Sequence, residues 1–262
     1  NINSSEMANT LLKDGELLLK GIFSKMEMEK LRISSEKTLN KFKEIKGPIR
    51  NNSIFINNAF LYNKLFLEVI SNEYICNIIE EAIGDTITIA NSSLANITFI
   101  DGQKDVAYGG TWHTDSRYIQ KGKVRLNHGF SYLVIVCIED FKNKKSSTKY
   151  VSGSHLFEGR PDRDLDENNY NLKTLNGEVG DVIILDSGIW HKAGTPTAES
   201  RWGLITYYTP WYFKPYYRLN EMFNDKDINE LSDRQLKLFH FTSIPPKNQF
   251  ESTNTLKSPE IF

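Results

Sequence analysis

Five short runs of β-branched and aromatic residues occupy the middle of the chain and constrain its fold more than any other feature. They lie at residues 86–90, 96–100, 130–138, 181–185 and 203–208. Clusters of Gly, Asp, Asn or Pro separate the runs, which is typical of the strands of a barrel or sandwich. We therefore expect a mainly β core in this part of the chain.

Helical patterns precede and follow the expected core. Ser24 followed by Glu27 fits a capping box at the start of one helix. A second helical zone covers residues 61–82 and ends near Gly84, a typical C-terminal cap. Ahead of both, residues 16–23 have the apolar character of a short buried strand.

The chain length favours one domain over residues 1–262, because no internal repeat and no long linker divides it. We expect a helical and short-strand N-terminal part over residues 1–85 and the β core over residues 86–210. A helical tail then covers residues 211–262, with a short amphipathic stretch at residues 231–239.

Charge balance and hydropathy narrow the class of partner. Lys and Arg number 32 against 33 Asp and Glu, so no global field attracts nucleic acid or an anionic membrane. No apolar run approaches the roughly 18 residues that span a bilayer, and the N-terminus lacks a signal-peptide pattern. Cys76 and Cys137 lie in apolar runs typical of buried thiols. We expect a cytoplasmic protein that acts on a small molecule.

The tetrapeptide Trp112-His113-Thr114-Asp115 carries the first candidate for chemistry. Residues two apart in an extended segment point to the same face, so His113 and Asp115 can bind one ion together. An imidazole and a carboxylate are two of the three ligands of the facial triad of non-haem iron, and the third comes from elsewhere. His-x-Asp alone is a weak indication, because the tripeptide also occurs by chance in surface loops.

A second candidate lies further along the chain. His191 follows an apolar strand that begins at Gly180-Asp181, and Arg201 stands ten residues beyond this histidine. His-x-Asp, a gap of 78 residues to the distal His, the Gly-Asp strand and the following Arg form one ordered set of motifs. This set resembles the phytanoyl-CoA dioxygenase-like family of Fe(II)- and 2-oxoglutarate-dependent oxygenases.

Two further motifs extend the resemblance to roughly residues 10–210. Residues 137–140 (CIED) and 151–155 (VSGSH) are similar to the family's strand-end acidic pair and its Pro-Gly-Ser-His turn. Ser152 replaces the usual proline of that turn, a departure that concerns loop geometry rather than chemistry.

The resemblance implies a mainly β fold with flanking helices around a double-stranded β-helix, the jelly-roll or cupin-like core. It implies that His113, Asp115 and His191 bind Fe(II), with 2-oxoglutarate and O₂ as cosubstrates. Arg201 would then hold the far carboxylate of 2-oxoglutarate, because a planar, permanently charged fork of donors suits a carboxylate.

Four weaker candidates complete the expected cofactor site. Asn96 and Thr98 lie on the run before His113 and could bond to the cosubstrate, although such residues as often face solvent. Tyr108 and Trp112 could line the pocket, although aromatic packing explains them as well.

The function implied is a dioxygenase that hydroxylates a small metabolite or natural-product intermediate and releases succinate and CO₂. Halogenating relatives have a small residue where Asp115 stands, so the carboxylate favours hydroxylation. A 2-oxoglutarate-dependent desaturase or halogenase is the first alternative. A non-catalytic ligand-binding β-sandwich is the second.

Overall fold

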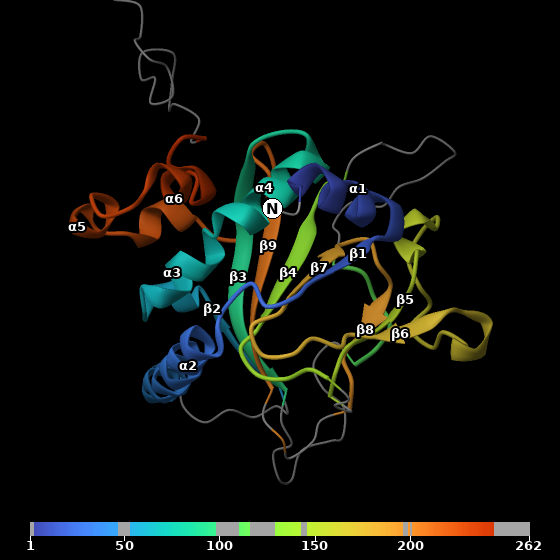
Figure 1. Ribbon diagram of the computed structural model, residues 1–262. Helices are drawn as coiled ribbons and strands as arrows, with labels where there is room; N and C mark the ends of the chain where they lie inside the picture. The colour runs from blue at the N-terminus through green and yellow to red at the C-terminus, as the bar shows by residue number, and fades with distance from the viewer. Residues whose placement is uncertain are drawn as a thin grey trace, which may run out of the picture.

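The computed structural model describes residues 3–46, 53–97, 110–115, 129–142, 146–195, 199 and 201–243. Its strands form two antiparallel sheets (Figure 1). The larger sheet has the order β1 (Glu16–Leu19), β7 (Val182–Asp186), β4 (Tyr132–Cys137), β9 (Trp202–Pro210), β3 (Ile87–Ile97) and β2 (Ser53–Asn57). The smaller sheet has the order β6 (Leu172–Thr174), β5 (Lys149–Val151) and β8 (His191–Lys192). Two facing antiparallel sheets confirm the predicted double-stranded β-helix.

Alternation along the strands of the larger sheet divides its side chains between two cores. On β7, Val182 and Ile184 pack outward against the helices, whereas Ile183 and Leu185 belong to the core between the sheets. Tyr132 on β4 belongs to the outward set. The strand lines the barrel through the alternate residues Leu133 and Ile135 instead.

Helices cover the outer face of the larger sheet (Figure 1). The helices are α1 (Ser4–Asp14), α2 (Lys25–Lys46), α3 (Leu65–Ile70), α4 (Glu73–Ile83), α5 (Asp225–Ile228) and α6 (Asp233–Leu238). Short 3-10 helices occur at Ala59–Leu61, Ser154–Leu156, Glu167–Asn169 and Leu219–Met222. The capping box that precedes α2 is confirmed, since the Ser24 N–H donates to Glu27 and the Glu27 N–H donates to Ser24 Oγ.

The structure divides the helix expected over residues 61–82 into α3 and α4. Asn72 causes the division, because its Oδ1 accepts a hydrogen bond from the Ile75 N–H at 3.1 Å and so begins a new helix. Gly84 ends α4 with a φ of 77°, as the sequence predicts.

The strand boundaries also differ from the sequence pattern in two places. β3 is one strand that continues through the polar residues 91–93, because pairing with β2 and β9 on its two sides satisfies their backbone. β1 ends at Leu19, earlier than the expected Phe23, because the chain turns at Gly21.

The Gly180-Asp181 motif joins the N-terminal segment to β7. Gly180 has a φ of 89°, and a Cβ at this position would lie 2.1 Å from the Phe23 carbonyl oxygen. The buried Asp181 carboxylate accepts hydrogen bonds of 2.9 Å from the N–H groups of Gly21 and Glu178 and from Lys20 Nζ. The motif that contributes to the family resemblance therefore has a structural role in this chain.

Asp181→Asn is expected to lower the free energy of unfolding at pH 7 by about 1–3 kcal/mol. The reason is that a neutral amide cannot replace the buried carboxylate as the acceptor of its charge-assisted hydrogen bonds. Burial alone would raise the pKa of Asp181, but the N–H donors and Lys20 outweigh burial and lower it. A lowered carboxyl pKa contributes stability above the unfolded pKa of about 3.9, and this stability is lost as pH falls through the folded pKa. Urea unfolding of the wild type and the variant at pH 7 and near pH 3 checks this prediction. An equal loss of unfolding free energy in the variant at both pH values would contradict it.

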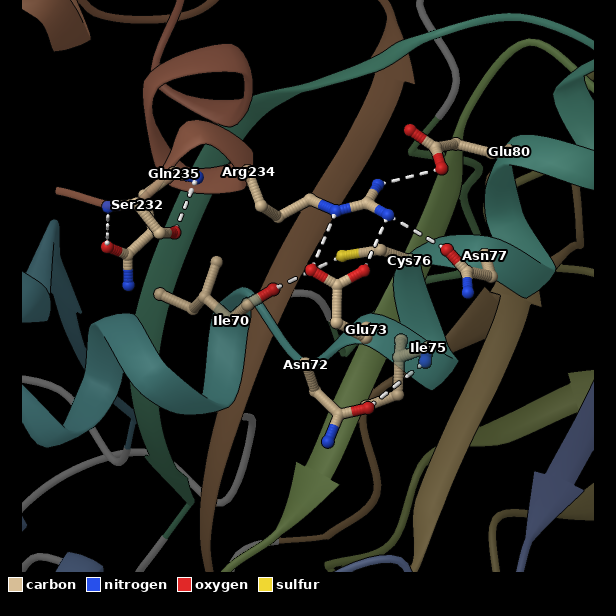
Figure 2. A network of polar contacts seen from close by, with 10 residues as sticks. All are labelled: Ile70, Asn72, Glu73, Ile75, Cys76, Asn77, Glu80, Ser232, Arg234 and Gln235. Carbon is tan, nitrogen blue, oxygen red and sulfur yellow. Dashed lines mark hydrogen bonds and ion pairs between the residues drawn. The ribbon is translucent and has the colours of Figure 1, made fainter.

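Arg234 of α6 attaches the C-terminal segment to α4 (Figure 2). Its guanidinium forms ion pairs of 2.7 Å with Glu73 and Glu80 and donates to Asn77 Oδ1 at 2.8 Å. These three partners lie one helical turn apart along α4, so a single side chain spans two turns of that helix. A capping box between Ser232 and Gln235 begins α6 beside them.

Arg234→Met is expected to lower the free energy of unfolding by about 1–3 kcal/mol, because it leaves two carboxylates without their shared partner. The control is Arg218→Met, since the exposed Arg218–Glu221 pair is of the kind that contributes about 0–1 kcal/mol. Thermal unfolding of both variants distinguishes them. Equal losses would show that Arg234 acts only as a surface charge.

Both cysteines are buried and free, which confirms the sequence prediction. Burial raises the pKa of each thiol to about 12, so neither is an activated nucleophile. Within the described residues, none of the helices has the length and apolar character that crossing a membrane requires.

Candidate active site

A cavity of about 130 Å³ lies between the two sheets. Apolar side chains, mostly from the larger sheet, form most of its wall. The polar part of the wall consists of His113, Asp115, Thr148, His191, Arg201 and Tyr207. The structure thus gathers three predicted metal ligands and the predicted carboxylate anchor at one place.

Backbone hydrogen bonds hold the two ligand-bearing segments together. The N–H of His113 donates to the carbonyl of His191, and the N–H of His191 donates to the carbonyl of His113, both at 2.9 Å. The N–H of Asp115 donates to the Ser187 carbonyl at 3.1 Å. The two histidines therefore form an antiparallel pair whose side chains share one face.

The same ring nitrogen of each histidine is bound to the backbone. His113 Nδ1 lies 2.7 Å from the Thr111 carbonyl oxygen, and His191 Nδ1 lies 2.9 Å from the Ile189 carbonyl oxygen. A carbonyl only accepts, so Nδ1 of each ring carries the proton in these contacts. When the rings are neutral, Nε2 of each has a lone pair that can bind a metal ion.

The Asp115 carboxylate lies between the two imidazoles. Its Oδ2 is 3.1 Å from His191 Nε2, and its Oδ1 is 3.8 Å from His113 Nε2. All three potential ligand atoms lie within 4.8 Å of one another. Burial would raise the pKa of Asp115, but His191, His113 and the Tyr207 hydroxyl lower it overall, which keeps the carboxylate ionised.

Arg201 is a buried cation that faces the cavity with no acidic partner among the described residues. Its Nε has no hydrogen-bond partner, and its guanidinium carbon lies 4.2 Å from the centroid of the Phe141 ring. Burial lowers the pKa of Arg201 to about 10, so the side chain is still charged at neutral pH. An aromatic face holds the cation without neutralising it.

A glycine leaves room beside this cation. Gly203 lies two residues after Arg201 on β9 and lines the same cavity. A Cβ at Gly203 would lie 2.8 Å from Phe141 Cζ, so even alanine would press on the ring that supports the guanidinium. The space between Arg201 and the triad depends on this residue having no side chain.

Two predicted cofactor residues point away from the cavity. Asn96 pairs with Trp202 on the outward face of β3, and its Oδ1 accepts a hydrogen bond from the Arg201 N–H at 3.0 Å. Trp112 packs with Val151 and Trp190 on the other side of the smaller sheet. Each lies one residue from an inward position, and alternation turns its side chain to the opposite face. Neither side chain therefore lines this cavity, and a contact of either one with the cosubstrate stays a prediction.

The other predictions have mixed outcomes. Thr98 and Tyr108 lie outside the described residues. His155 has a structural role, since its Nε2 lies 3.2 Å from the Leu12 carbonyl oxygen. Tyr207 is the site residue that sequence reasoning missed. The signal was present, because Tyr207 shares the parity of Arg201 along β9 and therefore the same face.

Comparison with known proteins agrees with this geometry. The family model described as phytanoyl-CoA dioxygenase (PhyH) matches residues 11–202. The chain belongs to this family. Its members are iron- and 2-oxoglutarate-dependent oxygenases, which confirms the resemblance stated from the motifs. No curated protein matches the chain by sequence.

Solved structures of the same architecture include three enzymes. The epimerase SnoN, in complex with Fe³⁺, α-ketoglutarate and nogalamycin RO, has a TM-score of 0.65 and 16% identity, with 81% of this chain and 86% of SnoN covered. The carbocyclase SnoK from nogalamycin biosynthesis has a TM-score of 0.62 and 16% identity, with 88% of this chain and 92% of SnoK covered. HygX from Streptomyces hygroscopicus, with nickel and 2-oxoglutarate bound, has a TM-score of 0.60 and 16% identity, with 81% of this chain and 89% of HygX covered. At these identities the similarity shows a shared fold.

The residues present fit the metal and cosubstrate that the family uses. Two neutral imidazoles and one carboxylate are the donor set of a facial triad, which leaves the remaining metal positions open. Arg201 has no acidic partner among the described residues and lines the same cavity as the triad, so it suits a carboxylate of the ligand that does not bind the metal. A ligand that bridges the two features must carry a metal-binding end and an anionic end.

Proposed function

We propose that the protein is an Fe(II)- and 2-oxoglutarate-dependent hydroxylase that acts on a small natural-product or metabolite substrate. His113, Asp115 and His191 bind the iron, and Arg201 binds the far carboxylate of 2-oxoglutarate. The reaction converts substrate C–H, O₂ and 2-oxoglutarate into substrate C–OH, succinate and CO₂. The bound iron would supply the activation of O₂. Full reduction of O₂ takes four electrons, of which 2-oxoglutarate supplies two and the substrate C–H bond supplies two.

The buried Arg201, which has no acidic partner among the described residues, is the single observation that carries the proposal. A buried charge without a partner costs several kcal/mol, so such a group is retained where a ligand completes it. The guanidinium fork offers two parallel donors to a carboxylate. Because Asn96 fixes the backbone of Arg201 and Phe141 supports its plane, the fork is oriented before the ligand arrives.

The size of the cavity supports a division of the site into two parts. Drug-sized ligands occupy pockets of roughly 300–1,000 Å³. The cavity between the sheets has about 130 Å³, which suits a small dicarboxylate and leaves no room for a large second molecule. The substrate therefore binds at the mouth of the cavity, on the side where His113 is the most exposed of the three ligands.

Hydroxylation is favoured by Asp115. A carboxylate at this position occupies the metal position that a halide needs, so halogenation is disfavoured. The similar structures are those of an epimerase, a carbocyclase and HygX, and the first and last are described with nogalamycin RO and hygromycin B. These descriptions support a natural product or its biosynthetic intermediate as the class of substrate, and they make epimerisation or ring closure the alternative outcome.

The test combines ligand binding with turnover. Under anaerobic conditions, Mn(II) and 2-oxoglutarate together are expected to raise the melting temperature, because ligands that bind only the folded state stabilise it. Candidate substrates are then screened aerobically with Fe(II) for release of succinate. Mass spectrometry of the product with ¹⁸O₂ distinguishes a hydroxylase, which incorporates the label, from an epimerase or carbocyclase, which does not. No stabilisation by either ligand would refute the enzyme proposal.

A further inference from the structure

The wall of the active-site cavity is exposed in one place and buried in another, which shows where the cavity opens. Phe55 of β2 is 36% exposed and is the only exposed residue among the described residues of the wall. Leu133 and Ile135 on β4 are buried, and so is Arg201 next to β9. The cavity therefore opens beside β2, the edge strand of the larger sheet.

Asn57 is the next residue of β2 whose side chain faces the same way as Phe55. Phe55 pairs with Ala95 of β3, and Asn57 pairs with Ser93. Because Phe55 and Ala95 line the cavity, Asn57 and Ser93 also lie on the inner face of the sheet. Asn57 is exposed, and residues two apart on a strand are about 7 Å apart. A molecule that enters past Phe55 therefore meets the Asn57 amide.

A chain of hydrogen bonds fixes the orientation of this amide. Ser93 Oγ donates to Asn57 Oδ1 at 2.6 Å, and Asn57 Nδ2 donates to the Tyr217 hydroxyl oxygen at 2.8 Å. Asn91 Nδ2 donates to Ser93 Oγ at 3.1 Å, which directs the Ser93 hydroxyl hydrogen toward Asn57. Since both ends of the amide are held, its second N–H and its second lone pair point in fixed directions.

Buried groups supply these hydrogen bonds to an exposed side chain. Ser93 and Asn91 are 4% and 7% exposed, and Asn91 Oδ1 has no hydrogen-bond partner among the described residues. If the network served only to satisfy buried groups, its hydrogen bonds would go to Asn91 rather than to Asn57, which water can reach. The network instead orients Asn57 in advance, which lowers the entropy that a ligand loses on binding.

We propose that Phe55 and Asn57 form the subsite for the primary substrate, and that this subsite takes a neutral ring that carries a hydroxyl group. This inference rests on the proposed function, in which the substrate binds at the mouth of the cavity. The Phe55 ring offers an apolar face to the substrate ring. The second N–H and lone pair of Asn57 match a hydroxyl, which can both accept and donate. Asn57, Ser93 and Tyr217 are neutral, so they supply no counter-ion for a charged group.

The experiment loads the protein with Mn(II) and 2-oxoglutarate without O₂ and measures the broadening of the ¹H NMR signals of benzyl alcohol, toluene and benzoate. Mn(II) broadens the signals of molecules that bind close to it, so the measurement reports binding at the mouth of the cavity. The wild type is expected to bind benzyl alcohol about 3- to 10-fold more tightly than toluene or benzoate, which is the effect of a hydrogen bond.

Two variants test the subsite, and a third is the matched control. Asn57→Ala is expected to remove the preference for the alcohol. Tyr217→Phe releases only one end of the Asn57 amide and is expected to reduce the preference in part. Asn229→Ala removes an exposed amide outside the network and is expected to behave as the wild type. None of the three side chains lines the cavity, so all variants are expected to keep wild-type affinity for Mn(II) and 2-oxoglutarate.

The outcomes separate this inference from the proposed function. Equal binding of benzyl alcohol by the wild type and Asn57→Ala would overturn the inference. A wild type that prefers toluene or benzoate, or that broadens none of the three, would also overturn it. The proposed function would stand in these cases, because Mn(II) and 2-oxoglutarate would still bind. Failure of the wild type to bind Mn(II) and 2-oxoglutarate would refute the proposed function and this inference with it.

Discussion

Arg201→Leu is expected to abolish binding of 2-oxoglutarate while making the ligand-free protein more stable. The two effects have one cause, because the buried guanidinium has no acidic partner among the described residues until the cosubstrate arrives. Removal of an unpaired buried charge is expected to add about 1–2 kcal/mol to the free energy of unfolding. Loss of a bidentate charge-assisted pair is expected to weaken 2-oxoglutarate binding by about 100-fold or more.

Titration of the Mn(II)-loaded protein with 2-oxoglutarate measures the first effect, and thermal unfolding without ligand measures the second. Arg201→Lys serves as the comparison, because it keeps the charge and removes the planar fork. We expect its affinity to fall between those of the wild type and Arg201→Leu. Affinity of Arg201→Leu within threefold of the wild type would show that the cosubstrate carboxylate binds elsewhere.

His113→Ala is expected to reduce substrate-dependent succinate release to background and to remove the thermal stabilisation by Mn(II). The imidazole supplies one of three ligands, and its backbone pairing with His191 does not depend on its side chain. The variant is therefore expected to fold. Metal titration followed by thermal unfolding checks binding without reference to turnover.

The control for this prediction is His155→Gln. His155 bonds through Nε2 to the Leu12 carbonyl, and a glutamine amide can donate to the same oxygen. We expect metal stabilisation and turnover close to wild type. Turnover that persisted in His113→Ala would mean that the metal ligands are assigned wrongly.

Much of the β core could be predicted from the sequence, because its strands are apolar runs with turn residues between them. β4 and β7 lie where residues 130–138 and 181–185 indicated. The sequence pattern predicted only the two ends of β3. Its middle consists of Asn91, Ser92 and Ser93, whose polar side chains hide a strand that pairing on two sides stabilises.

The residues of the candidate site also divide into those that the sequence could predict and those that it could not. His113, Asp115 and His191 could be found because ligand chemistry restricts the residue types and the order of motifs restricts their positions. Asn96 and Trp112 were assigned to the wrong face, because a change of one residue in strand parity reverses the direction of a side chain. Sequence proximity to a ligand is therefore a poor guide to contact with it.

The sequence by itself determined the fold class, the family and the three candidate metal ligands. These follow from local composition and from chemically restricted motifs, which are properties of neighbouring residues. The tertiary structure alone decided that Arg201 has no acidic partner among the described residues, that Phe141 supports it and that Tyr207 lines the same cavity as Asp115. Contacts between residues far apart in the chain depend on the register of the strands and on how the two sheets pack against each other. Neither can be predicted from the residues next to one another in the sequence.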